Sequence, residues 1–183
     1  MTTRRRVRAL AISGSLRASS SNGALLRAAA GLARESMEFS LYAGLAELPH
    51  FNPDLDDEVQ PPPPVKELRS QLAQADGVVI STPEYAHGVP GSLKNALDWI
   101  VSSGELRGKP VLLINASPGG GERAQASLVE TLQVMEARVL ESATVRVASI
   151  RGKLDAIGNV GDAGTLTALE AGLAALVSAI EGA

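Results

Sequence analysis

Short apolar runs alternate with helix-like segments along the whole chain, and this order limits the folds that are possible. The apolar runs fit buried strands, because each is brief and is bounded by Gly, Ser, Pro or charged residues. They cover residues 7–13, 38–42, 78–81, 111–116 and 144–148. Between them, apolar residues recur at helical spacing, as Leu169, Leu173 and Leu176 do near the end of the chain. Five repeats of strand and helix predict an α/β fold, a doubly wound parallel sheet with helices on both faces.

This fold also predicts where a ligand binds. In a doubly wound parallel sheet, ligands lie beyond the carboxyl ends of the strands. The first, third and fourth apolar runs each lead into a loop rich in Gly, Ser or Pro, and these loops cover residues 13–22, 82–91 and 117–121. The chain shows no internal repeat, so we expect residues 1–183 to form a single domain with one site at these loops.

The composition excludes several kinds of protein. There is no cysteine and there are only two histidines, so we expect no disulfide, no cysteine nucleophile and no metal site. A net charge of −3 gives no reason to expect a nucleic-acid partner. The first apolar run is shorter than the apolar part of a signal peptide, and no run approaches the length of about 20 residues that a membrane helix needs. We therefore expect a cytoplasmic protein that does not bind membranes.

The loop after the first apolar run has the composition of a phosphate site. It reads Ser13-Gly14-Ser15-Leu16-Arg17-Ala18-Ser19-Ser20-Ser21-Asn22 and leads into a helix, for which we expect Asn22 to be the N-cap. Unpaired N–H groups at a helix start attract anions, and hydroxyl groups and a guanidinium add hydrogen bonds. Capping alone needs a single Ser or Asn. The Gly-x-Gly-x-x-Gly and Gly-Lys-Ser/Thr fingerprints are missing, so the motif supports neither a dinucleotide fold nor ATP hydrolysis.

The second and third loops offer surroundings for a flat ligand. The second contains Glu84, Tyr85 and His87, although Tyr85 also fits an exposed aromatic or a subunit contact and His87 also fits a surface histidine. The third, Ser117-Pro118-Gly119-Gly120-Gly121, lets a planar ligand approach backbone N–H groups, although it also fits a flexible turn. A Ser–His–acid hydrolase is disfavoured because the chain has no Gly-x-Ser-x-Gly elbow.

Four segments together resemble a known family. They are Gly14-Ser15-Leu16-Arg17 with Ser20-x-Asn22; Pro83-Glu84-Tyr85 with Val89-Pro90-Gly91-x-Leu93-Lys94-Asn95-Ala96-Leu97-Asp98-Trp99; Gly108-Lys109-Pro110-Val111; and Leu154-Asp155-x-x-Gly158-Asn159. The Pro-Gly-x-Leu-Lys-Asn-Ala part is the most specific. On these segments the chain resembles the NAD(P)H-dependent FMN reductase family, the flavodoxin-like quinone, chromate and azo-dye reductases.

The resemblance implies a flavodoxin-like sheet of five strands in the order 2-1-3-4-5, a non-covalent FMN and NAD(P)H as co-substrate. It implies that the FMN phosphate is held by Ser15, Arg17, Ser20 and Asn22. It also implies ring contacts from Pro83, Glu84 and Tyr85 on one edge and from Ser117, Gly119 and Gly120 on the other. The family usually has Asn after Glu-Tyr, and this chain has Ala86, so one expected polar contact to the flavin is missing. Members of the family are similar in working as homodimers or homotetramers.

The activity implied by the resemblance is reduction of a small-molecule acceptor, such as a quinone, a flavin or an azo compound, by ping-pong hydride transfer through flavin N5. No side chain is then needed as a catalytic residue, and Tyr85 and His87 become candidates for shaping the acceptor pocket. The same loops would also serve a flavodoxin-like electron carrier or a flavin-binding regulator without turnover. A net charge of −3 does not favour the acidic face typical of a carrier.

Overall fold

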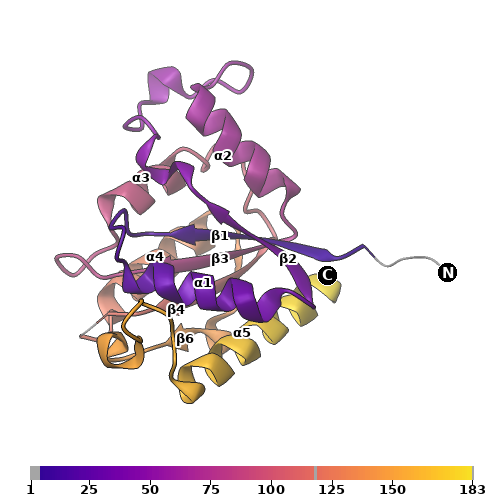
Figure 1. The fold of residues 1–183 in the computed structure, drawn as a ribbon. Coiled ribbons are helices and arrows are strands. Elements are labelled where there is room, and N and C mark those ends of the chain that lie inside the picture. Colours follow the sequence, from indigo (N-terminus) through magenta and orange to yellow (C-terminus); the bar gives the residue numbers. More distant parts are fainter. Residues whose placement is uncertain (1–4, 118, 183) are drawn as a thin grey trace.

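The computed structural model describes residues 5–117 and 119–182, and these form three layers, with a parallel sheet between two layers of helices (Figure 1). The strands are β1 (Val7–Ser13), β2 (Met37–Tyr42), β3 (Gly77–Thr82), β4 (Pro110–Asn115), β5 (Arg138–Val139) and β6 (Val145–Arg146). The sheet order is β2-β1-β3-β4-β5, and β6 also pairs with β4. The predicted flavodoxin-like order is confirmed.

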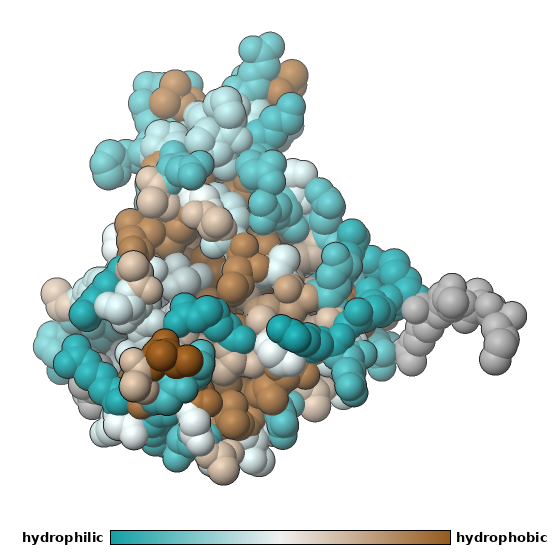
Figure 2. Space-filling model, in the orientation of Figure 1, coloured by the Kyte–Doolittle hydropathy of each residue, from teal (hydrophilic) through white to brown (hydrophobic). Residues whose placement is uncertain are grey.

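The helices divide between the two faces of the sheet. One face carries α1 (Ser21–Ala33) and α5 (Ala163–Glu181), and the other carries α2 (Pro63–Gln74), α3 (Gly91–Asp98) and α4 (Glu122–Val134). Short 3₁₀ helices lie at Gly44–Ala46, Pro53–Leu55, Glu141–Ala143 and Ile150–Lys153. On the face drawn in Figure 2, hydrophilic residues predominate over the projecting segment that holds α2, and apolar residues show between this segment and α1.

Alternation along each central strand builds the two cores. In β1, Leu10 and Ile12 enter the core beneath α2, α3 and α4, whereas Ala9 and Ala11 enter the core beneath α1 and α5. Successive side chains of a strand point to opposite faces, so a strand covered on both sides reads as a continuous apolar run. The alanines leave room for α1 to lie close to the sheet. This position places the start of α1 beside the carboxyl ends of β3 and β4.

The end of the sheet differs from the prediction. We expected one fifth strand over residues 144–148, but two short strands, β5 and β6, lie beside β4, with a 3₁₀ helix between them. Pro110 pairs with Arg138, and Ile114 pairs with Val145. A two-residue edge strand has no periodicity of its own, so the sequence pattern gave no signal for β5.

The start of α1 also corrects the prediction. Ser20 is the N-cap: its backbone is extended, with φ −71° and ψ 127°, and its Oγ accepts a hydrogen bond from the backbone N–H of Gly23 at 3.2 Å. Asn22 lies inside the helix. Both residue types are good N-caps, so propensity alone could not decide between them. Ser20 is the cap because the side chain of Asn22 is buried and forms its hydrogen bonds with Ser81 and Ala116.

Helix α5 requires a third correction. By length and composition alone, α5 is long and apolar enough to cross a membrane. No other helix in residues 5–117 and 119–182 meets these two criteria. We had expected no segment to approach that length. In the structure α5 packs against α1 and β4, and Leu169, Leu173 and Leu176 are buried in the core that these elements share. One face of α5 therefore belongs to the core, and 28% of its most apolar stretch of 18 residues is buried.

The long loop between β2 and α2 is fastened to α3 and the residue that follows it. The amide of Asn95 donates to the carbonyl of Pro49 at 2.9 Å, and its Oδ1 accepts from the backbone N–H of Phe51 at 2.7 Å. Trp99 is fully buried and donates from Nε1 to the same Pro49 carbonyl at 2.8 Å. Its ring meets that of Phe51 edge-on, with 5.1 Å between the centroids. The most specific segment of the sequence thus holds this loop in place.

We expect Asn95→Ala to lower the free energy of unfolding by about 1–2 kcal/mol, because the half-buried N–H of Phe51 loses its acceptor. Urea denaturation followed by Trp99 fluorescence measures the change. The neighbouring variant Lys94→Ala is the control, since it removes only an exposed ion pair to Asp98 and should lower stability by about 0.5 kcal/mol or less. Equal losses in the two variants would contradict the role given to Asn95.

Candidate functional site

One cavity lies at the carboxyl ends of the central strands, where the fold predicts a ligand. Its volume is about 650 Å³, within the range of about 300–1,000 Å³ that is typical of small-molecule sites. Six of the predicted site residues line it: Ser15, Arg17, Ser20, Asn22, Pro83 and Tyr85. Residues of the loops after β1 and β3 therefore lie together at the predicted edge of the sheet.

The first loop leaves β1 in close contact with β3. The backbone N–H of Gly14 donates to the carbonyl of Ser81 at 2.8 Å, and a Cβ added at Gly14 would lie 2.6 Å from Thr82 Oγ1. Only glycine fits this approach without displacing β3. The loop then reaches the second loop, because Ser15 Oγ lies 3.3 Å from the hydroxyl of Tyr85 and accepts from the N–H of Arg17.

Asn22 joins three elements through its side chain. Its Oδ1 accepts from Ser81 Oγ at 2.9 Å and from the backbone N–H of Ala116 at 3.1 Å, and its Nδ2 donates to the carbonyl of Ala116 at 3.4 Å. The residue is only 2% exposed. Its amide therefore fixes the start of α1 against β3 and β4. The side chain of Asn22 is therefore not available to an anion. Its backbone N–H is, because an N–H in the first turn has no acceptor within the helix.

Glu84 fixes the second loop to α4. Its Oε2 accepts from the backbone N–H groups of Arg123 and Ala124 at 3.1 and 3.0 Å, in the first turn of that helix. The N–H of Ala124 is the main reason that the pKa of Glu84 lies below its usual value, and His87 and Arg123 add to the effect. The N–H of Glu84 donates to Ser117 Oγ at 3.0 Å, which ties the second loop to the third.

The third loop turns sharply into α4. Gly121 has φ 67°, and an added Cβ would lie 2.2 Å from Asn115 Nδ2, so the turn requires glycine. Pro118 lies outside the described residues. Four predicted ring contacts, Glu84, Ser117, Gly119 and Gly120, belong to this part of the site and are not among the described residues that line the cavity. Their contact with a ring stays a prediction.

No motif in the sequence pointed to the loop after β6. Ser149, Ile150, Arg151, Gly152 and Leu154 line the cavity opposite the start of α1. We had assigned this segment only as a glycine-containing loop. The signal that could have found it is topological: the first and last helices pack against each other on one face of the sheet, so the segments that precede them are neighbours.

Comparisons with known proteins identify the family of this chain. Residues 7–151 match the family of NADPH-dependent FMN reductases. The chain belongs to this family. It is 41% identical over 167 residues to the quinone reductase of Escherichia coli K12, covering 88% of this chain and 89% of the relative. It is 37% identical over 160 residues to an NAD(P)H-dependent FMN reductase of Pseudomonas aeruginosa, covering 85% of each.

A solved structure gives the same result. The flavoenzyme NAD(P)H:(acceptor) oxidoreductase FerB of Paracoccus denitrificans superposes with a TM-score of 0.85 at 32% identity, covering 96% of this chain and 98% of that one. The predicted family, the flavodoxin-like fold, FMN with NAD(P)H and an oxidoreductase activity are confirmed at the level of the family.

Within this FMN reductase, Ala86 has a conformational explanation. Tyr85 and Gly88 exchange backbone hydrogen bonds at 3.1 and 2.9 Å, and the two residues between them, Ala86 and His87, have φ of 50° and 63°. Two positive φ values in a two-residue turn favour Asn or Gly. The preference of Asn for positive φ is therefore enough to explain why the family usually has Asn at this position.

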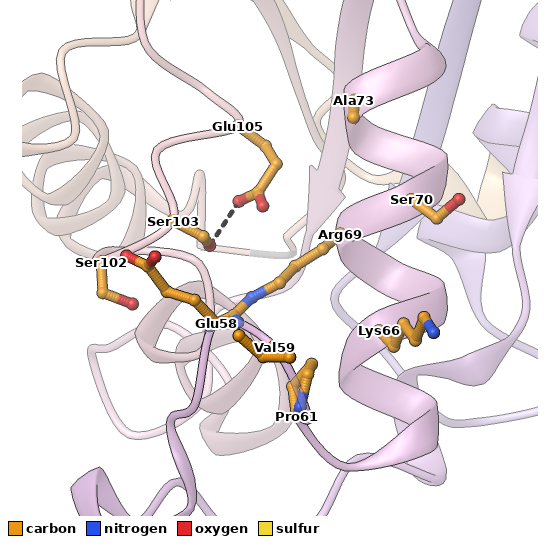
Figure 3. Close-up of a pocket in the computed structure, with 10 residues that line it drawn as sticks. All are labelled: Glu58, Val59, Pro61, Lys66, Arg69, Ser70, Ala73, Ser102, Ser103 and Glu105. Carbon is orange, nitrogen blue, oxygen red and sulfur yellow. Dashed lines mark hydrogen bonds between the residues drawn. The ribbon is translucent and has the colours of Figure 1, made fainter.

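A second hollow of about 500 Å³ lies beside α2, away from this cavity (Figure 3). Arg69 extends across it from α2, but its guanidinium is already bonded: Nη2 contacts Asp56 at 2.5 Å and the carbonyl of Trp99 at 2.6 Å. Glu58 and Glu105 also line the hollow. Arg69 therefore links the long loop to the end of α3, and we assign no ligand here.

We expect Glu84→Gln to lower the melting temperature at pH 7, because the neutral amide is a weaker acceptor for the N–H groups of α4. A carboxyl whose pKa is lower in the folded protein stabilises the fold at pH values above its pKa in the unfolded chain, which is about 4.3. This stabilisation is lost as the pH falls through the pKa of the folded protein. The difference from the wild type should therefore be constant above about pH 5 and shrink in more acidic buffer. Thermal unfolding between pH 3 and 8 measures it.

The control for this experiment is Glu122→Gln. Glu122 is an exposed carboxylate in the same helical turn, and it makes no hydrogen bond with the described residues. It should lower the melting temperature at pH 7 less than Glu84→Gln does. A Glu84→Gln variant whose melting temperature matches that of Glu122→Gln at every pH would show that Glu84 does not cap α4.

We expect Ala86→Asn to raise the free energy of unfolding by about 0.5–1 kcal/mol, because Asn tolerates positive φ better than Ala does. Affinity for FMN should stay within about twofold. Chemical denaturation and flavin titration measure the two quantities, and Ala156→Asn, at an exposed position without positive φ, is the control. Tighter FMN binding without a gain in stability would show a flavin contact instead.

Proposed function

We propose that this chain binds one FMN in the cavity between the loops after β1, β3 and β6, and that it uses NAD(P)H to reduce quinones, flavins, azo compounds or similar acceptors. The observation that supports this most directly is the charge of the cavity. Arg17 and Arg151 line it together with five serines, and no Asp or Glu is among its described lining residues. A phosphate dianion fits such a lining, because nothing there opposes its charge.

The phosphate end of the cofactor would lie at the start of α1. Ser15 and Ser20 present hydroxyl groups there, and Arg17 adds a guanidinium that forms strong hydrogen bonds with phosphate oxygens. The side chain of Asn22 positions these groups and the N–H groups of the first turn add the positive end of the helix dipole. We therefore assign Ser15, Arg17 and Ser20 to direct contact and Asn22 to contact through its backbone.

The ring would lie between the second and third loops. Pro83 and Tyr85 line the cavity on one side. Ser117, Gly119 and Gly120, which are outside its described lining, would meet the other edge of the ring. Bound FMN supplies the hydride chemistry, taking two electrons from NAD(P)H and delivering them to the acceptor. The chain then needs to orient the ring and leave one face open. The carboxylate of Glu84 is already used by α4, which leaves the exposed Tyr85 and His87 to shape the acceptor pocket.

The whole chain, residues 1–183, would form one functional domain that acts in the cytoplasm as a homodimer or homotetramer. The names of the relatives favour a reductase over an electron carrier or a regulator.

The decisive experiment adds FMN to the purified protein and then NADH or NADPH without oxygen. We expect stoichiometric FMN binding, loss of the yellow colour of oxidised flavin on adding the nicotinamide cofactor, and return of the colour on adding a quinone. Bound FMN that the nicotinamide cofactors do not bleach would favour a carrier or regulator. Protein that does not bind FMN would contradict the assignment of the cavity.

A further inference from the structure

We propose that Arg151 supplies a second guanidinium to the FMN phosphate and so makes the site selective for a phosphorylated flavin over riboflavin. This inference rests on the proposed function, since it concerns the same cavity. Arg151 belongs to the loop after β6, which lines the cavity together with the first turn of α1. Arg17 reaches the same cavity from the loop after β1.

The charge of this cavity differs from that of other hollows in the described structure. Each of three other hollows that contain an arginine also contains a glutamate: Arg69 lies with Glu58 and Glu105, Arg8 lies with Glu38, and Arg6, Arg27 and Arg34 lie with Glu38. A carboxylate beside a guanidinium competes with any anionic ligand. Arg17 and Arg151 share a cavity without such a competitor among its described residues, so their charges add at a bound phosphate.

Both guanidinium groups are free to bind. In residues 5–117 and 119–182, neither the side chain of Arg17 nor that of Arg151 has an ion pair or a hydrogen bond, whereas the nearby Arg146 donates from Nε to Gln125 at 3.2 Å. Two free arginines at one cavity match the two negative charges of a phosphate monoester near neutral pH. Arginine also fits phosphate oxygens with paired N–H groups.

The loop that carries Arg151 has a defined backbone. Ser149 has φ 51°, and its carbonyl accepts from the N–H of Gly152 at 3.1 Å. Further along, Leu154 and Val160 form an antiparallel bridge around a turn that Asp155 holds. The carboxylate of Asp155 accepts from the N–H groups of residues 157 and 159 at 3.0 and 2.8 Å. Arg151 thus stands on a fixed support, which reduces the entropy lost when it binds a ligand.

The test measures the dissociation constants of FMN and riboflavin for the wild type, Arg151→Ala and Arg17→Ala. We expect each variant to bind FMN at least about tenfold more weakly, which corresponds to about 1.4 kcal/mol. Both should bind riboflavin within about twofold of the wild type, because riboflavin has no phosphate. Arg151→Lys keeps the charge and should keep part of the preference for FMN.

The control is Arg27→Ala, which removes the same charge from α1 at a residue that lines another hollow. Arg151 would have no role at the phosphate if Arg151→Ala bound FMN as tightly as Arg27→Ala does. Equal losses for FMN and riboflavin, with unchanged thermal unfolding, would also overturn the inference. A wild type that binds neither flavin would instead refute the proposed function, and this inference with it.

Discussion

The buried amide of Asn22 is the interaction on which the geometry of the site depends. It bonds the start of α1 to Ser81 at the end of β3 and to Ala116 just beyond β4. Each of these groups is buried, and a buried polar group without a partner costs about 1–3 kcal/mol, so the three elements hold one arrangement. Glu84 continues the same network on the other side, where it connects the second loop to Ser117 and to the first turn of α4. Contacts within the chain therefore hold the loops after β1, β3 and β4 in place.

Several residues that carry the family resemblance serve the same purpose. Lys109 donates to the carbonyls of Leu72 and Ala75 at the end of α2, and burial lowers its pKa although Asp76 and Glu105 act in the opposite direction. Asn95 and Trp99 secure the long loop, and Asp155 shapes the wall of the cavity. A motif that identifies a flavin enzyme thus consists largely of residues that fix the backbone.

The sequence was sufficient for the first four strands and the five α-helices, because central strands and core helices show periodicities set by burial, whereas the two short strands beside β4 have none. It was also sufficient for the loops after β1 and β3, whose Ser, Arg and Tyr residues lie together as expected. It could not separate Ser20 from Asn22 as the helix cap, since the outcome depends on a contact about 94 positions away, between Asn22 and Ala116. It could not find Arg151 either, because the neighbourhood of the first and last helices exists only in the folded chain.

The exposure of the site residues explains how such a protein divides its work. Asn22 and Ser117 are buried and determine where the backbone lies, whereas Arg17, Tyr85 and Arg151 are exposed at the cavity and have few or no side-chain partners of their own. Since the cofactor carries the redox chemistry, the chain needs only to supply position, charge and shape. A change at a buried residue then acts through stability, and a change at an exposed lining residue acts on which ligand is held. This separation lets one scaffold keep its FMN while the groups that face the acceptor vary.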